Sequence, residues 1–316
     1  METVFVLCLL YGYNITVIER WSGQMFKRFV SKEPVLKGWS GDKKYCLTDE
    51  HGNRFLLRVT PIEKYDDKKR EYELMRRVAE LGVPMCAPLE FGTCDEGVYS
   101  IQTWIDGEDA EQVMSGYSDT EQYVYGLEAG RILRKIHSIP APETQEDWEK
   151  RFNRKIDRKI VLYEACPIKY ESGQAEAFID YINNNRRLLA GRPQTFQHGD
   201  YHIGNMMIGR NGKLYIIDFN RHDFGDPWEE FNRIVWCAQK APMFASGMVD
   251  GYFDGIVPAD FWQLLALYIS SNTLSSLPWA VPFGEKEIAT MRNQANDVFN
   301  WYKGMSDPVP TWYSKP

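Results

Sequence analysis

The sequence lacks the marks of a membrane or secreted protein. No apolar run approaches the ~20 residues that a membrane-spanning helix needs. The apolar stretch from Val4 to Leu10 has no basic residue ahead of it and no small-residue cleavage site, unlike a secretory signal. It is either the first strand or helix of the fold or part of an extension, residues 1–24, from a start codon upstream of Met25. We expect a cytoplasmic protein with no membrane partner.

Cysteine pairs and basic charge are also scarce. The six cysteines contain no C-x-x-C pair and no metal-like Cys/His spacing, which argues against a disulfide framework or a zinc site. The net charge of −7 argues against nucleic acid, because a protein that binds phosphate backbones usually has a concentrated basic face. A cationic partner is easier to accommodate. The apolar fraction of 44% and the charged fraction of 26% are those of an ordinary globular protein.

Hydrophobic patterning predicts an α+β protein in two parts. Residues 36–105 are strand-rich, with a hairpin across the turn at 50–53 and one charged helix at about 64–81. After Asp106-Gly107 the pattern predicts mainly helices, interrupted by a short β segment near Phe196 and a hairpin over 205–218. The segment from Phe261 to Ile269 is apolar on all sides and predicts a buried helix.

The strongest local signal is His198-Gly199-Asp200, with Asn205 five residues after the aspartate and Asp218 at the end of an apolar β run. Phosphoryl transfer uses one carboxylate to accept the proton of the attacking hydroxyl, which we assign to Asp200. The amide oxygen of Asn205 and the carboxylate of Asp218 are hard ligands suited to Mg²⁺. A literal Asp-Phe-Gly at 223–225 has no apolar strand leading into it, so we place the metal role at Asp218.

This H-G-D-x-x-x-x-N pattern with the later I-D-F resembles that of the aminoglycoside phosphotransferase family, relatives of choline kinases and of protein kinases. The resemblance runs from about Lys37 to Trp279, and Gly225-Asp226-Pro227-Trp228 strengthens it. It implies a two-lobed protein-kinase-like fold, with a small antiparallel-sheet N-terminal lobe over 1–105, a hinge at about 102–106 and a larger, mainly helical C-terminal lobe over 106–316. It also implies ATP or GTP as phosphoryl donor, and that His198 braces the catalytic loop more readily than it moves a proton.

In the N-terminal lobe, the resemblance implies a base on the third strand that binds the α- and β-phosphates and is paired to a glutamate on the next helix. Arg58 occupies the position of the base. Helical periodicity favours Glu71 over Glu73 as its partner, because Glu71 shares a face with apolar residues. The turn containing Ser40 and Gly41 would cover the phosphates.

Two further features complete the implied nucleotide and acceptor sites. The segment 101–105 resembles the hinge, where backbone groups of Thr103 and Ile105 would meet a purine edge. The acidic residues Asp226, Glu229 and Glu230 form either a solvated surface or a rim that attracts a cationic acceptor. Which of Glu229 and Glu230 would bind the acceptor, and which would bind Arg233 along a helix, is left open.

The resemblance favours a kinase that phosphorylates a hydroxyl of an aminoglycoside antibiotic or a related amino alcohol, and so an antibiotic-resistance enzyme. The same chemistry could act on choline, homoserine or a macrolide sugar. A catalytically inactive nucleotide-binding module is a further alternative, although Asp200, Asn205 and Asp218 are all present. The oligomeric state has no signature in the sequence.

Overall fold

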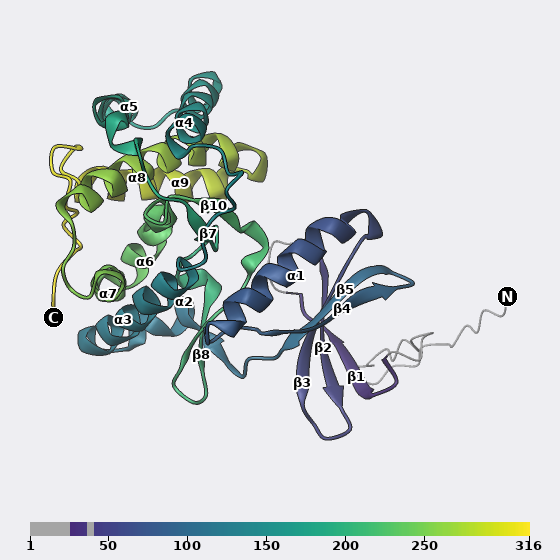
Figure 1. Cartoon of the computed structure of the whole chain (residues 1–316). Helices are drawn as coiled ribbons and strands as arrows, with labels where there is room; N and C mark the ends of the chain where they lie inside the picture. The colour runs from purple at the N-terminus through teal and green to yellow at the C-terminus, as the bar shows by residue number, and fades with distance from the viewer. Residues whose placement is uncertain (1–25, 37–40) are drawn as a thin grey trace, which may run out of the picture. The chain divides into compact units, whose positions relative to one another are not determined.

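The computed structural model describes residues 26–36 and 41–316 (Figure 1). These residues form two compact units. The first contains the described residues up to Tyr72 together with Pro88–Trp104, and the second contains Glu73–Ala87 and Ile105–Pro316. The predicted segment from Val4 to Leu10 lies outside the described residues.

The first unit is built on a five-stranded antiparallel sheet in the order β1-β2-β3-β5-β4. Its strands are β1 (Phe29–Pro34), β2 (Lys43–Asp49), β3 (Arg54–Thr60), β4 (Pro88–Cys94) and β5 (Gly97–Thr103). The predicted hairpin is confirmed as β2 and β3. Its turn places Gly52 at a φ of +81°, and the Asp49 carboxylate accepts hydrogen bonds from the backbone N–H groups of His51 and Asn53.

Alternation along these strands builds the core of the first unit. Leu47, Leu57 and Ile101 are buried on neighbouring strands, and Tyr99 stacks edge-on against Phe26. Helix α1 (Tyr65–Glu80) follows β3 and confirms the charged helix that the sequence predicts.

The second unit is mainly helical. Its larger helices confirm the mainly helical pattern that the sequence predicts after Asp106-Gly107: α3 (Asp119–Ile136), α4 (Trp148–Ala165), α5 (Gln174–Asn185), α6 (Ile234–Lys240), α7 (Pro242–Phe253), α8 (Ala259–Ala280) and α9 (Glu285–Trp301). The short helix α2 (Ala110–Val113) was not predicted. Helix α3 begins with a capping box, in which Ser118 and Glu121 bond each other's backbone N–H groups.

Two small sheets lie within the helical unit. The predicted hairpin is β8 (Met206–Gly209) and β9 (Leu214–Ile216), and β6 (Gly107–Asp109) joins it as a third strand. The predicted segment near Phe196 is β7 (Thr195–Gln197), which pairs with β10 (Asp223–Gly225). The literal Asp-Phe-Gly is therefore an edge strand, a feature that sequence patterning did not predict.

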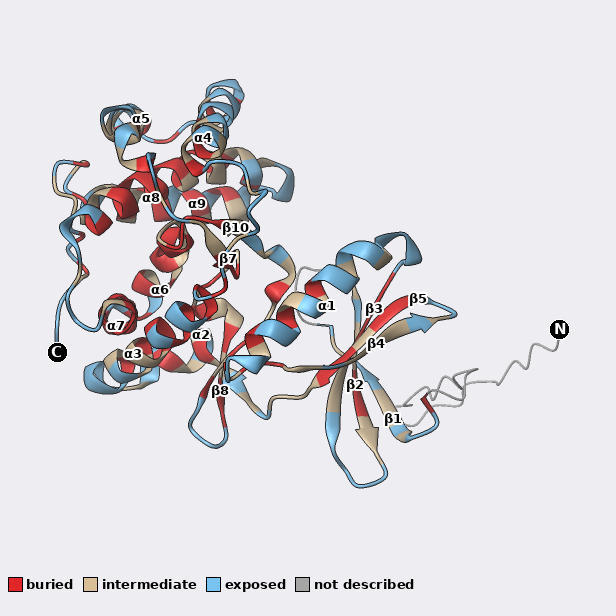
Figure 2. Ribbon diagram, viewed as in Figure 1, coloured by how far each residue is buried: buried red, intermediate tan, exposed pale blue. Residues whose placement is uncertain are grey.

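Helix α8 forms the centre of the second core and is buried along most of its length (Figure 2). Phe261, Leu265 and Ile269 have at most 1% of their surface exposed, so the predicted buried helix is confirmed. Across 26–36 and 41–316, no helix is long and apolar enough to cross a membrane.

Candidate active site

The segment 195–218 builds the centre of the site from one strand, one loop and one hairpin. Strand β7 leads into His198-Gly199-Asp200, a 3₁₀ helix (Ile203–Asn205) follows, and β8 and β9 return the chain to Asp218. The backbone N–H of Ile217 donates to the carbonyl oxygen of Asn205 at 3.0 Å. The two residues predicted to bind metal are thereby held on neighbouring backbone segments.

His198 is fully buried and both of its ring nitrogens are occupied. Nε2 lies 2.9 Å from the carbonyl oxygen of Ile217, so it carries the proton and donates. Nδ1 accepts from the backbone N–H of Asp200 at 3.3 Å. Burial lowers the pKa of His198, with the charge of Glu230 acting in the opposite direction. A neutral ring with this tautomer positions Asp200 and joins the loop to the strand that precedes Asp218.

Glu230 fixes the backbone of the loop that contains Asp200. Its side chain is almost fully buried and accepts the N–H of Gly199 at 2.9 Å and that of Tyr201 at 3.4 Å. Gly199 has a φ of +84°, and a Cβ there would overlap with the carbonyl oxygen of Arg221. Glycine is therefore required here, and Glu230 holds the loop instead of facing an acceptor.

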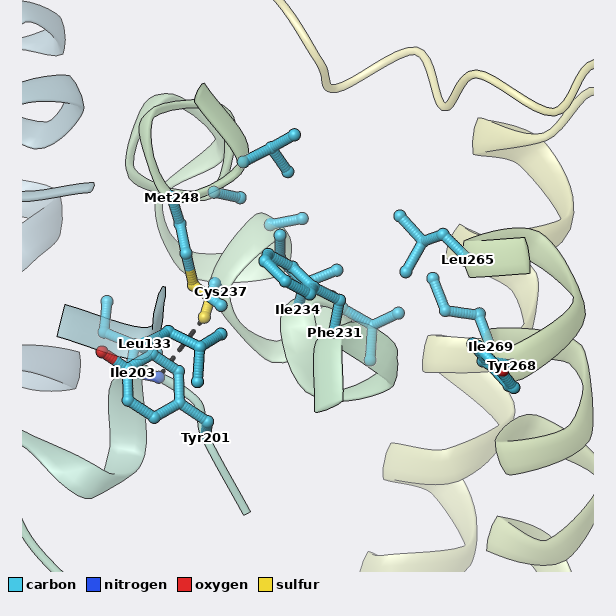
Figure 3. Packing of buried hydrophobic residues seen from close by; sticks show 14 of the residues in the cluster. Leu133, Tyr201, Ile203, Phe231, Ile234, Cys237, Met248, Leu265, Tyr268 and Ile269 are labelled. Carbon is cyan, nitrogen blue, oxygen red and sulfur yellow. Dashed lines mark hydrogen bonds between the residues drawn. The ribbon is translucent and has the colours of Figure 1, made fainter. Parts of the chain in front are cut away.

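Apolar contacts fix the rest of the loop (Figure 3). Tyr201 and Ile203 are fully buried, and the Tyr201 hydroxyl donates to the carbonyl oxygen of Ala129 in α3 at 2.7 Å. The backbone N–H of Ile203 donates to the Cys237 sulfur at 3.3 Å. Two residues that follow Asp200 are thus anchored in the core of the second unit.

The carboxylate of Asp200 remains partly exposed, at 18% of the side-chain surface. Arg233 Nε lies 3.3 Å from Oδ1 and Arg221 Nη1 lies 3.6 Å from Oδ2. Burial alone would raise the pKa of Asp200, but His202 and the two arginines outweigh it and hold the pKa well below its usual range. Asp200 is ionised at neutral pH and can accept a hydrogen bond from a hydroxyl.

Asn205 and Asp218 present the oxygens expected of a magnesium site. Asn205 Nδ2 donates to the carbonyl oxygen of Asp200 at 2.9 Å, which leaves the amide oxygen as its metal-binding atom. Asp218 lies two residues after the end of β9, with a φ of +68° and a ψ of 63°, a left-handed conformation that redirects the chain. One amide oxygen and one carboxylate fit Mg²⁺, which commonly takes its other ligands from phosphates and water.

The remaining predicted acidic residues are paired inside the chain. Asp226 is fully buried, receives Arg192 Nε at 2.6 Å and accepts the Tyr268 hydroxyl at 2.6 Å. Glu229 is 12% exposed and forms an ion pair with Lys155 at 3.1 Å. The charges of Lys155 and Lys159 lower the pKa of Glu229 despite the opposing effect of burial. Asp226 and Glu230 are therefore not surface carboxylates.

In the first unit, Arg58 belongs to a buried ion network. Its guanidinium donates from Nε and Nη2 to Asp42 Oδ2 at 3.0 and 2.7 Å. Lys68 Nζ joins the same oxygen at 3.1 Å and reaches Glu71 Oε2 at 2.8 Å. Burial would raise the pKa of Asp42, but Arg58 and Lys68 together lower it.

Periodicity was correct on burial in α1, since Glu71 is buried and Glu73 is exposed. Glu71 forms an ion pair with Lys68, and Lys68 and Arg58 both bind Asp42. Lys68 and Asp42 therefore connect Glu71 to Arg58. Sequence analysis missed both residues. Lys68 carries a detectable signal, because it precedes Glu71 by three positions on one helix face.

The structure describes three of the four other residues that were predicted to bind the nucleotide. Ser40 lies outside the described residues, and Gly41 is an exposed bend just before β2. Thr103 is the last residue of β5, opposite Phe55, and Ile105 is the first residue after the boundary of the first unit.

Arg221 and Arg233 are site residues that sequence analysis did not single out as contacts of Asp200.

Comparison with known proteins identifies the class of protein to which this chain belongs. The sequence model described as the phosphotransferase enzyme family matches residues 32–262, most of the chain. The chain is therefore a phosphotransferase of the kind that acts on alcohol groups. It belongs to the phosphotransferase enzyme family, as the loop motif predicted.

Solved structures share the fold at low sequence identity. Aminoglycoside phosphotransferase APH(4)-Ia aligns with a TM-score of 0.64 and 16% identity, covering 87% of this chain and 95% of that one. Amicoumacin kinase hAmiN, in complex with AMP-PNP, Ca²⁺ and Ami, aligns with a TM-score of 0.59 and 13% identity, covering 88% and 90%. A gentamicin complex of APH(2")-IIa aligns with a TM-score of 0.59 and 16% identity, covering 86% and 93%. No curated protein matches the sequence. The two-lobed protein-kinase-like fold is thereby confirmed.

Proposed function

We propose that this protein is a Mg²⁺-dependent kinase that transfers the γ-phosphoryl group of ATP or GTP to a hydroxyl of a small molecule. The observation that carries the proposal is the Asp200 carboxylate, which stays partly exposed and ionised on a loop that is fixed by the buried side chains of His198, Tyr201 and Ile203. Such a fixed carboxylate can orient a hydroxyl for in-line attack. Solved neighbours with bound ADP and AMP-PNP support a nucleotide donor.

In the proposed reaction, the acceptor hydroxyl donates a hydrogen bond to Asp200. The acceptor oxygen forms a bond to the γ-phosphorus as the bond from that phosphorus to the bridging oxygen of the diphosphate breaks. The hydroxyl proton passes to Asp200 and then to solvent, and the nucleoside diphosphate leaves. A carboxylate with a lowered pKa is a weak base, so its main contribution is orientation, with proton transfer late in the reaction.

The other residues have supporting roles in this proposal. His198 and Glu230 position the loop through its backbone. Asn205 and Asp218 would hold Mg²⁺, which supplies charge neutralisation on the phosphates when bound. In the first unit, Arg58 with Lys68 would bind phosphate oxygens, and the turn at Ser40 and Gly41 would cover the phosphates. Backbone groups of Thr103 and Ile105 would meet the purine edge.

The test is release of ADP or GDP by the purified protein with Mg²⁺ and each triphosphate, across cationic, neutral and anionic hydroxyl compounds. Aminoglycosides belong in the panel because the neighbours include complexes with hygromycin B and gentamicin. Choline, homoserine and a macrolide complete it. We expect turnover that depends on one acceptor class and on Mg²⁺. Bound nucleotide without transfer to any acceptor or to water would indicate an inactive binding module instead.

A further inference from the structure

Two basic side chains lie beside the Asp200 carboxylate, where we propose that the acceptor hydroxyl binds. Arg233, just before α6, and Arg221, in the turn after Asp218, both approach the carboxylate. Their side chains are 26% and 52% exposed, so each guanidinium has donors left for a ligand. One carboxylate thus faces two permanent positive charges.

Helix α4 adds a second pair of cations. Lys155 and Lys159 are one turn apart, and Lys155 forms its ion pair with Glu229. Lys159 is partly buried and has no ion-pair partner among the residues that the structure describes. Burial lowers the pKa of Lys159 to about 7, and the neighbouring charges of Lys155, Glu229 and Arg233 also act on it. Lys155, Lys159, Glu229 and Arg233 therefore belong to one electrostatic environment, and Arg233 connects it to Asp200.

We name these four side chains the basic cluster: Lys155, Lys159, Arg221 and Arg233. The two carboxylates that pair with it are Asp200 and Glu229, so four cations face two anions when all are charged. Of the three acidic residues that the sequence suggested as an acceptor rim, Asp226 and Glu230 do not pair with this cluster. Asp226 is paired with Arg192, and Glu230 is buried beneath the loop backbone.

We propose that the acceptor carries an anionic group, a carboxylate or a phosphate, beside the hydroxyl that is phosphorylated, and that the basic cluster binds that group. This proposal rests on the proposed function, because it takes Asp200 as the group that binds the acceptor hydroxyl. An acceptor bound there places its neighbouring atoms beside Arg233. Guanidinium groups match the geometry of carboxylate and phosphate oxygens, whereas a cationic amino sugar would meet like charges.

Three three-carbon compounds with a 1,2-diol and different charge test the proposal: D-glycerate, glycerol and 3-amino-1,2-propanediol. Their binding is measured by ligand-observed NMR to the full chain saturated with Mg²⁺ and a non-hydrolysable ATP analogue, at constant ionic strength. We expect D-glycerate to bind most tightly and the amine least. Glycerol 3-phosphate, as a separate arm, distinguishes a phosphate from a carboxylate, and either preference over glycerol supports the proposal.

Variants on α4 assign the preference to the basic cluster. Lys159→Gln and Lys155→Gln should each weaken anion binding roughly tenfold, and Lys159→Arg should retain it. Lys150→Gln is the matched control, because Lys150 is an exposed lysine on the first turn of the same helix. It should bind the anions as the wild type does. Thermal unfolding of each variant verifies that it is folded.

Several outcomes would overturn the proposal: amine binding equal to or tighter than D-glycerate binding, no binding of either anion, or an equal loss in Lys150→Gln. The measurement requires no phosphoryl transfer. Failure of the proposed function would instead appear as nucleotide turnover that is absent or independent of Asp200, whatever the anions do.

Discussion

The neutral histidine at the start of the catalytic loop contributes to stability as well as to geometry. His198 donates to Ile217 and accepts from Asp200, and a second proton on Nδ1 would break the latter contact. Because burial lowers the pKa of His198, the folded chain keeps this ring neutral at a pH where the unfolded chain protonates it.

This difference predicts a loss of stability in mild acid. The unfolded chain binds the proton at about pH 6.5, so the contribution of His198 is fully present above that pH and is lost as the pH falls toward the lowered folded pKa. Between about pH 7.5 and pH 5.5 we expect this residue to remove about 1 kcal/mol from the free energy of unfolding. Urea denaturation at the two pH values measures it.

Two variants serve as comparisons for this prediction. His198→Gln can still donate to Ile217 but cannot titrate, so it should be less stable at the higher pH and lose less on acidification. His51→Gln, at an exposed histidine in the β2–β3 turn, should follow the wild type. An equal loss on acidification in His198→Gln would show that His198 is not the source.

Residue-scale prediction from sequence succeeded where local periodicity decides. Glu71 is buried and Glu73 exposed because a helix of regular period places them on different faces. It could not place Asp226 and Glu230, whose partners Arg192 and Gly199 are 34 and 31 residues away. A motif identifies the residue types of a site, but the burial of each carboxylate depends on contacts that only the folded chain makes.

At the scale of elements, α3 and α7 pack with their backbones in contact. Each helix carries two glycines four residues apart, and a Cβ on any of them would overlap with a backbone atom of the other helix. The four are Gly126, Gly130, Gly247 and Gly251. Because α3 also supplies the carbonyl of Ala129 that binds Tyr201, this packing supports the catalytic loop.

We therefore expect Gly130→Ala to lower the free energy of unfolding by at least about 2 kcal/mol, since its methyl group would displace the carbonyl of Met248. Chemical denaturation gives the value. Gly116→Ala is the control, because a Cβ at Gly116 meets no atom within 4 Å. Equal stability of the two variants would mean that the helices separate at little cost.

Sequence analysis predicted helices and strands that are long or that pair with a segment nearby in the chain. The helices α3 and α4 and the hairpin of β2 and β3 have patterns complete within one short segment. Strands β6 and β10 have three residues each, and Gly107 of β6 pairs with Gly209, far along the chain. No alternation is visible in three residues, so these strands are defined only by their distant partners. The paired glycines of α3 and α7 were the available signal for close helix packing.

At the scale of the whole molecule, family membership and fold fix the reaction class, whereas the acceptor depends on side chains that vary within one fold. The sequence-based expectation of a cationic acceptor came from the family resemblance, the negative net charge and the acidic residues Asp226, Glu229 and Glu230. In the structure two of them are buried and paired, and basic side chains lie at Asp200. The charge of an acceptor is therefore better inferred from what remains unpaired near the reacting group than from local composition.

The most direct test of the central claim compares nucleoside diphosphate release by the wild type and Asp200→Asn, with nucleotide binding measured in parallel. The account predicts a fall in kcat of at least about 10³-fold with nucleotide binding retained. Asp223→Asn, in the literal Asp-Phe-Gly and paired with Arg151, should keep the wild-type rate. An Asp200→Asn enzyme that turns over at the wild-type rate would contradict the assignment of Asp200 to the reacting hydroxyl.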